Sequence, residues 1–235
     1  MQTIYHEKFS YAKLSVEDGT SLADVFLNTN ADYVRLEVNA SAQVDKECLQ
    51  EKNFIWVDRT VRAKISLNRV DGLDRLVRME VRQLDEITED VFEVAKSAFV
   101  KDRRFFLSLD YDKEIGHEVL HDYIIQYEGV PKKVFGCFYE NKMVGALIAI
   151  QISETEYETV LGAILPEWQS KGVGVSLYAY EFDQLKKQGV KTLYSRISTD
   201  NVASLNLHIS LCKGNLAFMQ PLDVYIKSGK STVAY

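Results

Sequence analysis

The sequence predicts a mixed α/β (α+β) fold in which strands and helices share one central sheet. Apolar and polar residues alternate in short segments such as 33–38, as they do in half-buried strands. Residues 172–187 instead carry apolar side chains at helical spacing. The polar, glycine-bearing segment 68–76 separates a shorter patterned region from a longer one. We therefore predict a small α/β lobe at residues 1–74 and a second domain at 75–235.

The first region alternates short strands with short helices. Residues 54–67 alternate apolar and polar side chains, with a slip near Asp58, and Ser21 is a suitable N-cap for a helix. In chain order, we predict a strand at 11–16, a helix at 21–28, a strand at 33–38, a helix at 44–52 and a strand at 54–67.

The second region predicts a longer series of elements. Glu140, Asn141 and Lys142 separate two apolar runs and indicate a hairpin, and Gly189 closes a long helix. We predict strands at 77–84, 134–139, 143–152, 157–164, 192–197 and 218–226, and helices at 87–99, 115–127, 172–187 and 202–211.

The composition restricts the classes of partner. The chain has 235 residues, with 28 Lys and Arg against 34 Asp and Glu, and a net charge of −6. This acidic balance argues against nucleic-acid binding, which needs a basic surface. The longest apolar stretch, residues 143–150, is too short to cross a bilayer, so we predict no membrane partner.

The cysteines and the N-terminal residues predict a cytoplasmic location. Cys48, Cys137 and Cys212 are odd in number and far apart, which is typical of reduced thiols. Residues 1–14 lack the apolar run of a secretory signal.

A turn between two predicted elements carries the clearest functional signal. Residues 169–174, Gln-Ser-Lys-Gly-Val-Gly, follow the strand at 157–164 and open the helix at 172–187. Glycines allow close approach of a ligand, while helix amides and the helix dipole favour phosphate oxygens. Lys171 adds a positive charge. The turn predicts a pyrophosphate site, although an ordinary helix start has a similar composition, and neither GxxxxGK[ST] nor GxGxxG is present.

The spacing QxxGxG resembles the acyl-CoA loop of the GNAT superfamily of N-acetyltransferases. The order of elements around the loop also resembles that family, as does Asn201 followed by Ser204 and Leu207. The resemblance implies a GNAT fold with a mixed, splayed central sheet, preceded by a small GNAT-like α/β half-domain. It also implies acetyl-CoA as co-substrate and direct attack of a primary amine on the thioester.

The family's functional residues map onto this sequence by position. Strand 160–164 would splay from the next strand and pair with pantetheine, and one of its amides would stabilise the oxyanion. His208 stands where the family has the tyrosine that protonates the leaving thiolate, so it is the predicted catalytic residue. The predicted cofactor-binding residues are Leu161, Gly162, Ala163, Ile164, Gln169, Ser170, Lys171, Gly172, Val173, Gly174, Asn201 and Ser204.

The acceptor is predicted to be a small-molecule amine. Residues 33–67 are similar to the half-domain before the GNAT core in acetyltransferases that modify the 4-amino group of dTDP-4-amino-4,6-dideoxy sugars. Arg103, Arg104 and Phe105 combine charge with a ring and would bind a nucleotide diphosphate, although a solvated surface would have the same composition. A homodimer is left open.

Two other functions follow from the residues. Because His208 departs from the family pattern, a non-catalytic CoA-binding module is the main alternative. His117, Glu118 and His121 form an HExxH motif, which is typical of zinc hydrolases. Asp122 follows directly and no pattern supplies an obvious third ligand, although Glu128 or Glu140 could be proposed, so we favour an ordinary amphipathic helix and predict no metal. His208 and Cys212 are one helical turn apart, a spacing that we interpret as packing.

Overall fold

The computed structural model describes residues 2–5, 10–16, 33–40, 46–100, 102, 113–219 and 221–228. In the first part of the chain, the predicted strands and the helix at 44–52 are confirmed, whereas the predicted helix at 21–28 lies outside the described residues. The elements are β1 (Gln2–Tyr5), which we did not predict, β2 (Ser10–Val16), β3 (Tyr33–Asn39), α2 (Lys46–Glu51) and β4 (Ile55–Ser66).

The remaining elements follow the predicted order, with boundaries that differ by a few residues. They are η1 (Leu67–Arg69), η2 (Asp74–Leu76), β5 (Glu80–Leu84), α3 (Glu89–Ala98), α4 (Lys113–Ile125), β6 (Lys132–Tyr139), β7 (Lys142–Ser153), β8 (Glu156–Ile164), η3 (Pro166–Trp168), α5 (Val173–Lys187), β9 (Thr192–Ser198), α6 (Val202–Cys212), β10 (Leu216–Phe218) and β11 (Leu222–Ser228).

The strand predicted at 218–226 is wrong as a single element. It is divided into β10 and β11, and Pro221 stands directly before β11. Proline has no amide hydrogen to donate to a neighbouring strand, so it is found at strand starts and interruptions rather than inside a sheet.

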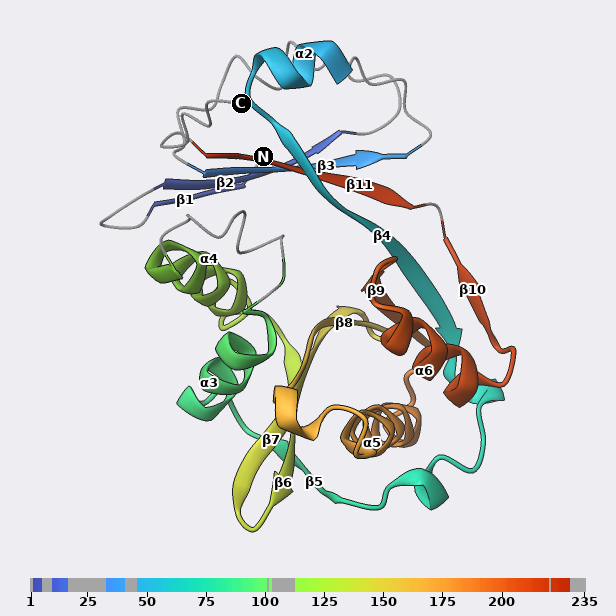
Figure 1. Ribbon diagram of the computed structural model, residues 1–235. Coiled ribbons are helices and arrows are strands. Elements are labelled where there is room, and N and C mark those ends of the chain that lie inside the picture. Colours follow the sequence, from blue (N-terminus) through green and yellow to red (C-terminus); the bar gives the residue numbers. More distant parts are fainter. Residues whose placement is uncertain are drawn as a thin grey trace.

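All described strands join one mixed sheet, which confirms the predicted fold class (Figure 1). Within the described residues the order is β1-β2-β3-β11-β4-β9-β8-β7-β6-β5, and β10 also pairs with β4. The pairs β2–β3 and β8–β9 are parallel, and the other pairs are antiparallel.

Strand β4 connects the two ends of this sheet. Its first half pairs with β11 and its second half pairs with β9. Strand β11 lies between β3 and β4, so a C-terminal segment completes the N-terminal part of the sheet. One sheet runs through both parts of the described chain without a break. The domain boundary at residue 74 therefore stays a prediction.

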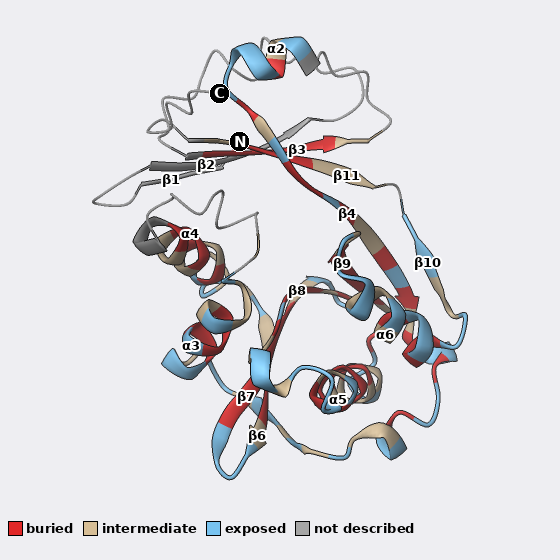
Figure 2. Ribbon diagram, viewed as in Figure 1, coloured by how far each residue is buried: buried red, intermediate tan, exposed pale blue. Residues whose placement is uncertain are grey.

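Apolar side chains form a core on each face of the sheet. On one face, residues of α3 and α4 such as Val91 and Ile124 pack with β7 and β8, and with Ile226 of β11. On the other face, residues of α5 such as Leu177 and Phe182 pack against β6, β7 and β9. Figure 2 shows this pattern as buried faces on the helices that turn toward the strands.

The position of β11 leads to a stability prediction. Ile226 is fully buried in the core that β11 shares with α3 and α4, so Ile226→Ala should lower the free energy of unfolding by about 2–5 kcal/mol. Lys227→Ala, at a partly exposed site in the same strand, is the control and should change it by less than about 0.5 kcal/mol. Urea unfolding would measure both; equal effects would contradict a structural role for β11.

Candidate functional site

The site begins where β8 and β9 part. Their parallel pairing runs from Glu156 and Thr192 to Thr159 and Ser195, and no further pair is formed. Strand β8 continues to Ile164, paired only with β7. The predicted splay of strand 160–164 is therefore confirmed. In the described structure, the edge of residues 161–164 that turns away from β7 has no strand opposite it, so its peptide groups are open to an extended ligand.

A bulge and a side-chain hydrogen bond mark the point of parting. Ile148 pairs with Leu161 but Ala149 pairs with Thr159, which makes Val160 an extra residue in β8. The Val160 carbonyl accepts a hydrogen bond of 2.7 Å from the Tyr123 hydroxyl of α4. The bulge changes the direction of the end of β8, and the hydrogen bond from Tyr123 fixes that end to α4.

The predicted phosphate turn lies at the end of the free segment of β8. Gly172 caps α5 with a φ of 83°, a left-handed conformation that suits glycine, and Ser170 has a φ of 66°. The first turn of α5 is open: among the described residues, the amides of Val173, Gly174 and Val175 have no hydrogen-bond partner. Such amides bind anions well.

Two side chains of the turn are also placed. The ammonium group of Lys171 lies 4.8 Å from the centre of the Trp168 ring, and Trp168 packs on Tyr139. The Lys171 ammonium group thus lies on the ring of Trp168, two residues before the turn at Ser170 and Gly172. The Gln169 amide lies 3.5 Å from the Ile164 carbonyl, which links the turn to the end of β8.

Gly174 is where α5, β8 and α6 come close together. A Cβ atom there would lie 3.1 Å from Cδ1 of Ile164 and 3.4 Å from Cδ2 of Leu207. The first distance is tight and the second is at the lower limit of ordinary contact, so a larger side chain would press against β8 and α6. Figure 1 shows α5 below β8, with α6 next to α5.

Asn201 and Ser204 form the cap of α6. The Asn201 carboxamide oxygen accepts a 3.0 Å hydrogen bond from the Ser204 amide, a typical N-cap interaction. The capping bond uses the oxygen of Asn201. The cofactor-binding role of Asn201 and Ser204 stays a prediction.

His208 is buried at the side of the splay that faces α5. Its exposure is 0%, and Nδ1 lies 2.8 Å from the Ser204 carbonyl oxygen. A carbonyl only accepts, so Nδ1 carries the hydrogen. Burial lowers the pKa of His208, which favours the neutral ring. In that ring Nε2 holds a lone pair, and it has no hydrogen-bond partner within the described chain. Nε2 of the neutral ring can therefore accept a proton. The predicted role, donation of a proton to the leaving thiolate, would require the protonated imidazolium ring.

Three further polar residues of α5 and β8 are buried, and Tyr178 is the one that contacts His208. The Tyr178 ring meets the His208 ring edge to face, with centroids 4.8 Å apart. Glu181, one turn further along α5, is fully buried and accepts a 2.7 Å hydrogen bond from the Thr159 hydroxyl. Burial raises the pKa of Glu181 to about 8, and the bond from Thr159 lowers it by less. We did not predict this group, because its members come from three separate elements.

The other face of β4 and β9 carries charged side chains, which we also missed. Arg62 donates two hydrogen bonds to Glu158, of 3.2 and 2.8 Å, and its guanidinium lies 3.9 Å from the centre of the Tyr194 ring. Arg196 lies 3.6 Å from the Glu37 carboxylate. Residues directly opposite in neighbouring strands share a face, and the polar alternation at 58–64 and 194–198 was the available signal.

The other predicted motifs do not gather into a second site. His121 stacks on Phe92, and no group of three His, Cys, Asp or Glu side chains in the described residues is placed to hold a metal ion. Burial raises the pKa of the Cys212 thiol to about 12, so it is protonated at neutral pH. The predicted substrate residues Arg103, Arg104 and Phe105 lie outside the described residues.

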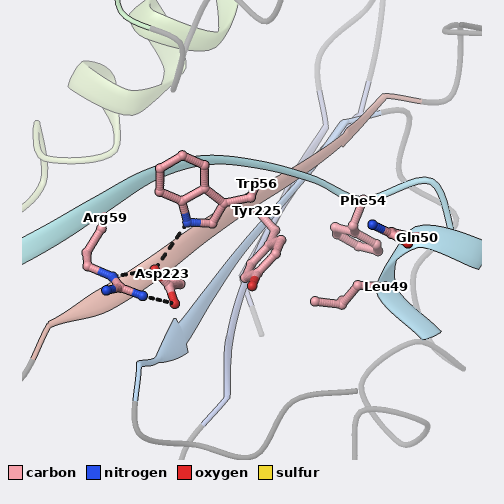
Figure 3. Close-up of a pocket in the computed structure, with 7 residues that line it drawn as sticks. All are labelled: Leu49, Gln50, Phe54, Trp56, Arg59, Asp223 and Tyr225. Atoms are coloured by element: carbon pink, nitrogen blue, oxygen red, sulfur yellow. Dashed lines mark hydrogen bonds and ion pairs between the residues drawn. The ribbon is translucent and has the colours of Figure 1, made fainter. Parts of the chain in front are cut away.

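A separate pocket of about 270 Å³ lies on the α2 side of the sheet (Figure 3). Its charged groups pair with each other: Arg59 donates to both oxygens of Asp223, and the Trp56 indole donates to one of them. It is lined by Leu49, Gln50, Phe54, Trp56, Arg59, Asp223 and Tyr225. In the described part of the chain, no helix is long and apolar enough to span a membrane.

Comparison with known proteins identifies the fold and the family. The profile of the acetyltransferase (GNAT) family matches residues 90–211, which is more than half of the chain. No curated protein matches the sequence.

Solved structures share the fold at low sequence identity. A protein of unknown function from Staphylococcus epidermidis is 13% identical, with a TM-score of 0.59 over 88% of this chain and 76% of that one. A GCN5-related N-acetyltransferase from Sphaerobacter thermophilus is 11% identical, with a TM-score of 0.54 over 86% and 62%. A putative GNAT-family acetyltransferase from Novosphingobium aromaticivorans is 15% identical, with a TM-score of 0.52 over 90% and 80%. The present chain thus spans less than two thirds of the S. thermophilus protein.

Burial of Glu181 leads to a prediction for the pH dependence of stability. An unfolded glutamate releases its proton near pH 4.5, whereas folded Glu181 holds it to about pH 8. The contribution of Glu181 to the free energy of unfolding should therefore fall as the pH rises from about 4.5 to 8. Glu181→Gln removes this pH dependence, because glutamine carries no ionisable proton. Relative to the parent, its free energy of unfolding should rise by less than about 1 kcal/mol at pH 5 and by on the order of 4 kcal/mol at pH 9.

Urea unfolding at the two pH values would measure this difference. Glu154→Gln in an exposed turn controls for the loss of one carboxyl. An equal effect of Glu181→Gln at both pH values would show that Glu181 is not held protonated by the fold.

Proposed function

The chain belongs to the acetyltransferase (GNAT) family, and on that premise we propose that it is an N-acetyltransferase that transfers the acetyl group of acetyl-CoA to a primary amine of a small molecule. The free edge of β8 beside the open N-terminus of α5 carries this proposal. Acetyl-CoA is the acyl donor of the family. An extended, amide-bearing pantetheine fits an unpaired strand edge, and its pyrophosphate fits unpaired helix amides.

The reaction follows from these positions. The amine would attack the thioester carbonyl at the point where β8 and β9 part, and an amide of residues 161–164 would stabilise the oxyanion. Lys171 and the amides of Val173 and Gly174 would hold the pyrophosphate. Direct attack needs no acyl-carrying cysteine, and Cys137 and Cys212 are poorly suited to that role, because both are buried and burial raises the pKa of each thiol.

A specific observation favours a second function, CoA binding without turnover. His208 replaces the expected tyrosine, and its bond to Ser204 leaves Nε2 as an acceptor. Consumption of acetyl-CoA in the presence of amines separates the two functions, because a binding module would hold CoA with no release of free thiol.

For the acceptor, we propose a nucleotide-linked 4-amino-dideoxy sugar of the kind that TDP-fucosamine acetyltransferase modifies. The similarity of residues 33–67 to the half-domain of that enzyme supports this proposal. The charged face of β4 and β9 also supports it, because it combines the Arg62 and Arg196 guanidinium groups with the Tyr194 ring. Guanidinium groups suit a diphosphate, and a ring can stack on a base or sugar.

The cofactor site leads to a binding prediction. Gly174→Val should raise the Kd for acetyl-CoA by about 30-fold or more, which is about 2 kcal/mol, because a branched side chain would press against Ile164 of β8 and Leu207 of α6 beside the proposed pyrophosphate site. Calorimetry would measure the affinity, and thermal melting would confirm the fold. Gly129→Val, at an open position with nothing within 4 Å, is the matched control. Unchanged affinity in the Gly174 variant would contradict the site.

The acceptor is tested by a substrate panel. Release of CoA would be followed with dTDP- and UDP-amino sugars, polyamines, amino acids and peptides. We expect turnover with the amino sugars, and a fall of about tenfold or more in kcat/KM for Arg104→Ala, because a charge-assisted bond to the diphosphate would be lost. Turnover confined to polyamines or peptides, or an Arg104 variant with full activity on sugars, would count against this acceptor.

A further inference from the structure

A tyrosine of α5 reaches the free segment of β8. Gly162 is in the middle of that segment, and a Cβ atom added there would overlap the hydroxyl oxygen of Tyr178. The hydroxyl therefore lies directly against the backbone of β8, beyond Thr159, where the strands have already parted. The absence of a side chain at Gly162 makes room for it.

The hydroxyl of Tyr178 is also unused in the structure. Within the described residues it has no hydrogen-bond partner, although the rest of the ring is enclosed by Phe182 and His208. The residue is 8% exposed, so it is not sealed off. A buried tyrosine normally uses its hydroxyl in a hydrogen bond, and the missing partner points to a ligand or water at the splay.

His208 does not supply a competing donor. Its Nδ1 hydrogen is used by the Ser204 carbonyl, and Nε2 of the neutral ring has only a lone pair. Burial raises the pKa of Tyr178 above its ordinary value, so the phenol keeps its hydrogen throughout the working pH range. Of the two rings that meet beneath the splay, only Tyr178 offers a hydrogen to a ligand.

We propose that the Tyr178 hydroxyl is a catalytic hydrogen-bond donor to the sulfur of acetyl-CoA, supplied from α5 in place of a donor on α6. This inference rests on the proposed function. The amine nitrogen forms a bond to the carbonyl carbon, the carbon–sulfur bond breaks, and its electron pair stays on sulfur. The thiolate is held by the Tyr178 hydroxyl. The nitrogen loses one proton to solvent, and the thiolate of CoA takes up one proton from solvent when it leaves, so the protons balance.

The test measures the pKa of the CoA thiol in the binary complex, by the ultraviolet absorbance of the thiolate. A donor to sulfur favours the thiolate, so the thiol pKa of CoA bound to Tyr178→Phe should exceed that of CoA bound to the parent by about one to two units. The kcat should fall by about 10- to 100-fold, with little change in the KM for acetyl-CoA. The variant deletes only an unpaired hydroxyl, so its melting temperature should be close to that of the parent.

Two variants serve as controls. Tyr180→Phe removes a hydroxyl from the same helix, on a ring that packs against Phe135, and should change neither quantity. His208→Phe removes the Nε2 lone pair but leaves the Tyr178 hydroxyl, which is the proposed hydrogen-bond donor to sulfur. It should therefore not raise the pKa of the bound CoA thiol.

The outcomes distinguish the two proposals. A parent that binds CoA and turns over amines, with an unchanged thiol pKa in Tyr178→Phe, would overturn the role of Tyr178 and leave the function standing. A raised thiol pKa in His208→Phe alone would assign the donor to His208 instead. A parent that does not bind CoA would overturn both proposals.

Discussion

The end of strand pairing beyond Thr159 and Ser195 is the constraint on which the site depends. Two parallel strands that stayed paired would satisfy each other's peptide groups and leave nothing for a ligand. Because they part, the end of β8 is paired on one side only, with β7, and keeps a free edge within the sheet. The peptide groups of this edge are left able to form hydrogen bonds with an extended, amide-bearing chain.

Several contacts hold the parted strand in place. The bulge at Val160 re-aims its end, and the Tyr123 hydroxyl ties the bulged carbonyl to α4. On the other face, Gly174 brings α5 to within van der Waals contact of Ile164. The turn at 169–174, the free strand edge and the buried rings of α5 and α6 therefore lie next to one another, although they come from separate parts of the chain.

The second consequence of the topology concerns the N-terminal strands. Strand β4 continues the sheet beyond β9, and β11 joins it to β3, so the N-terminal strands are an extension of the same sheet. Arg62 of β4 stands opposite Arg196 of β9, and each is close to a carboxylate. A sheet that ended at β9 would leave this edge unpaired and would lack Arg62.

The sequence by itself determined most of the succession of helices and strands and the glycine-bearing turn at 169–174, because periodicity and short spacings depend on neighbouring residues. It also determined the family, through the loop and the elements around it. Only the tertiary structure decided that β11 lies between β3 and β4, and that Tyr178 meets Gly162. It also decided that His208 bonds through Nδ1, with its ring enclosed by α5, and that Glu181 is buried beside Thr159. The placement and environment of these residues depend on elements distant in the chain, and a local pattern does not report which distant residues share a space.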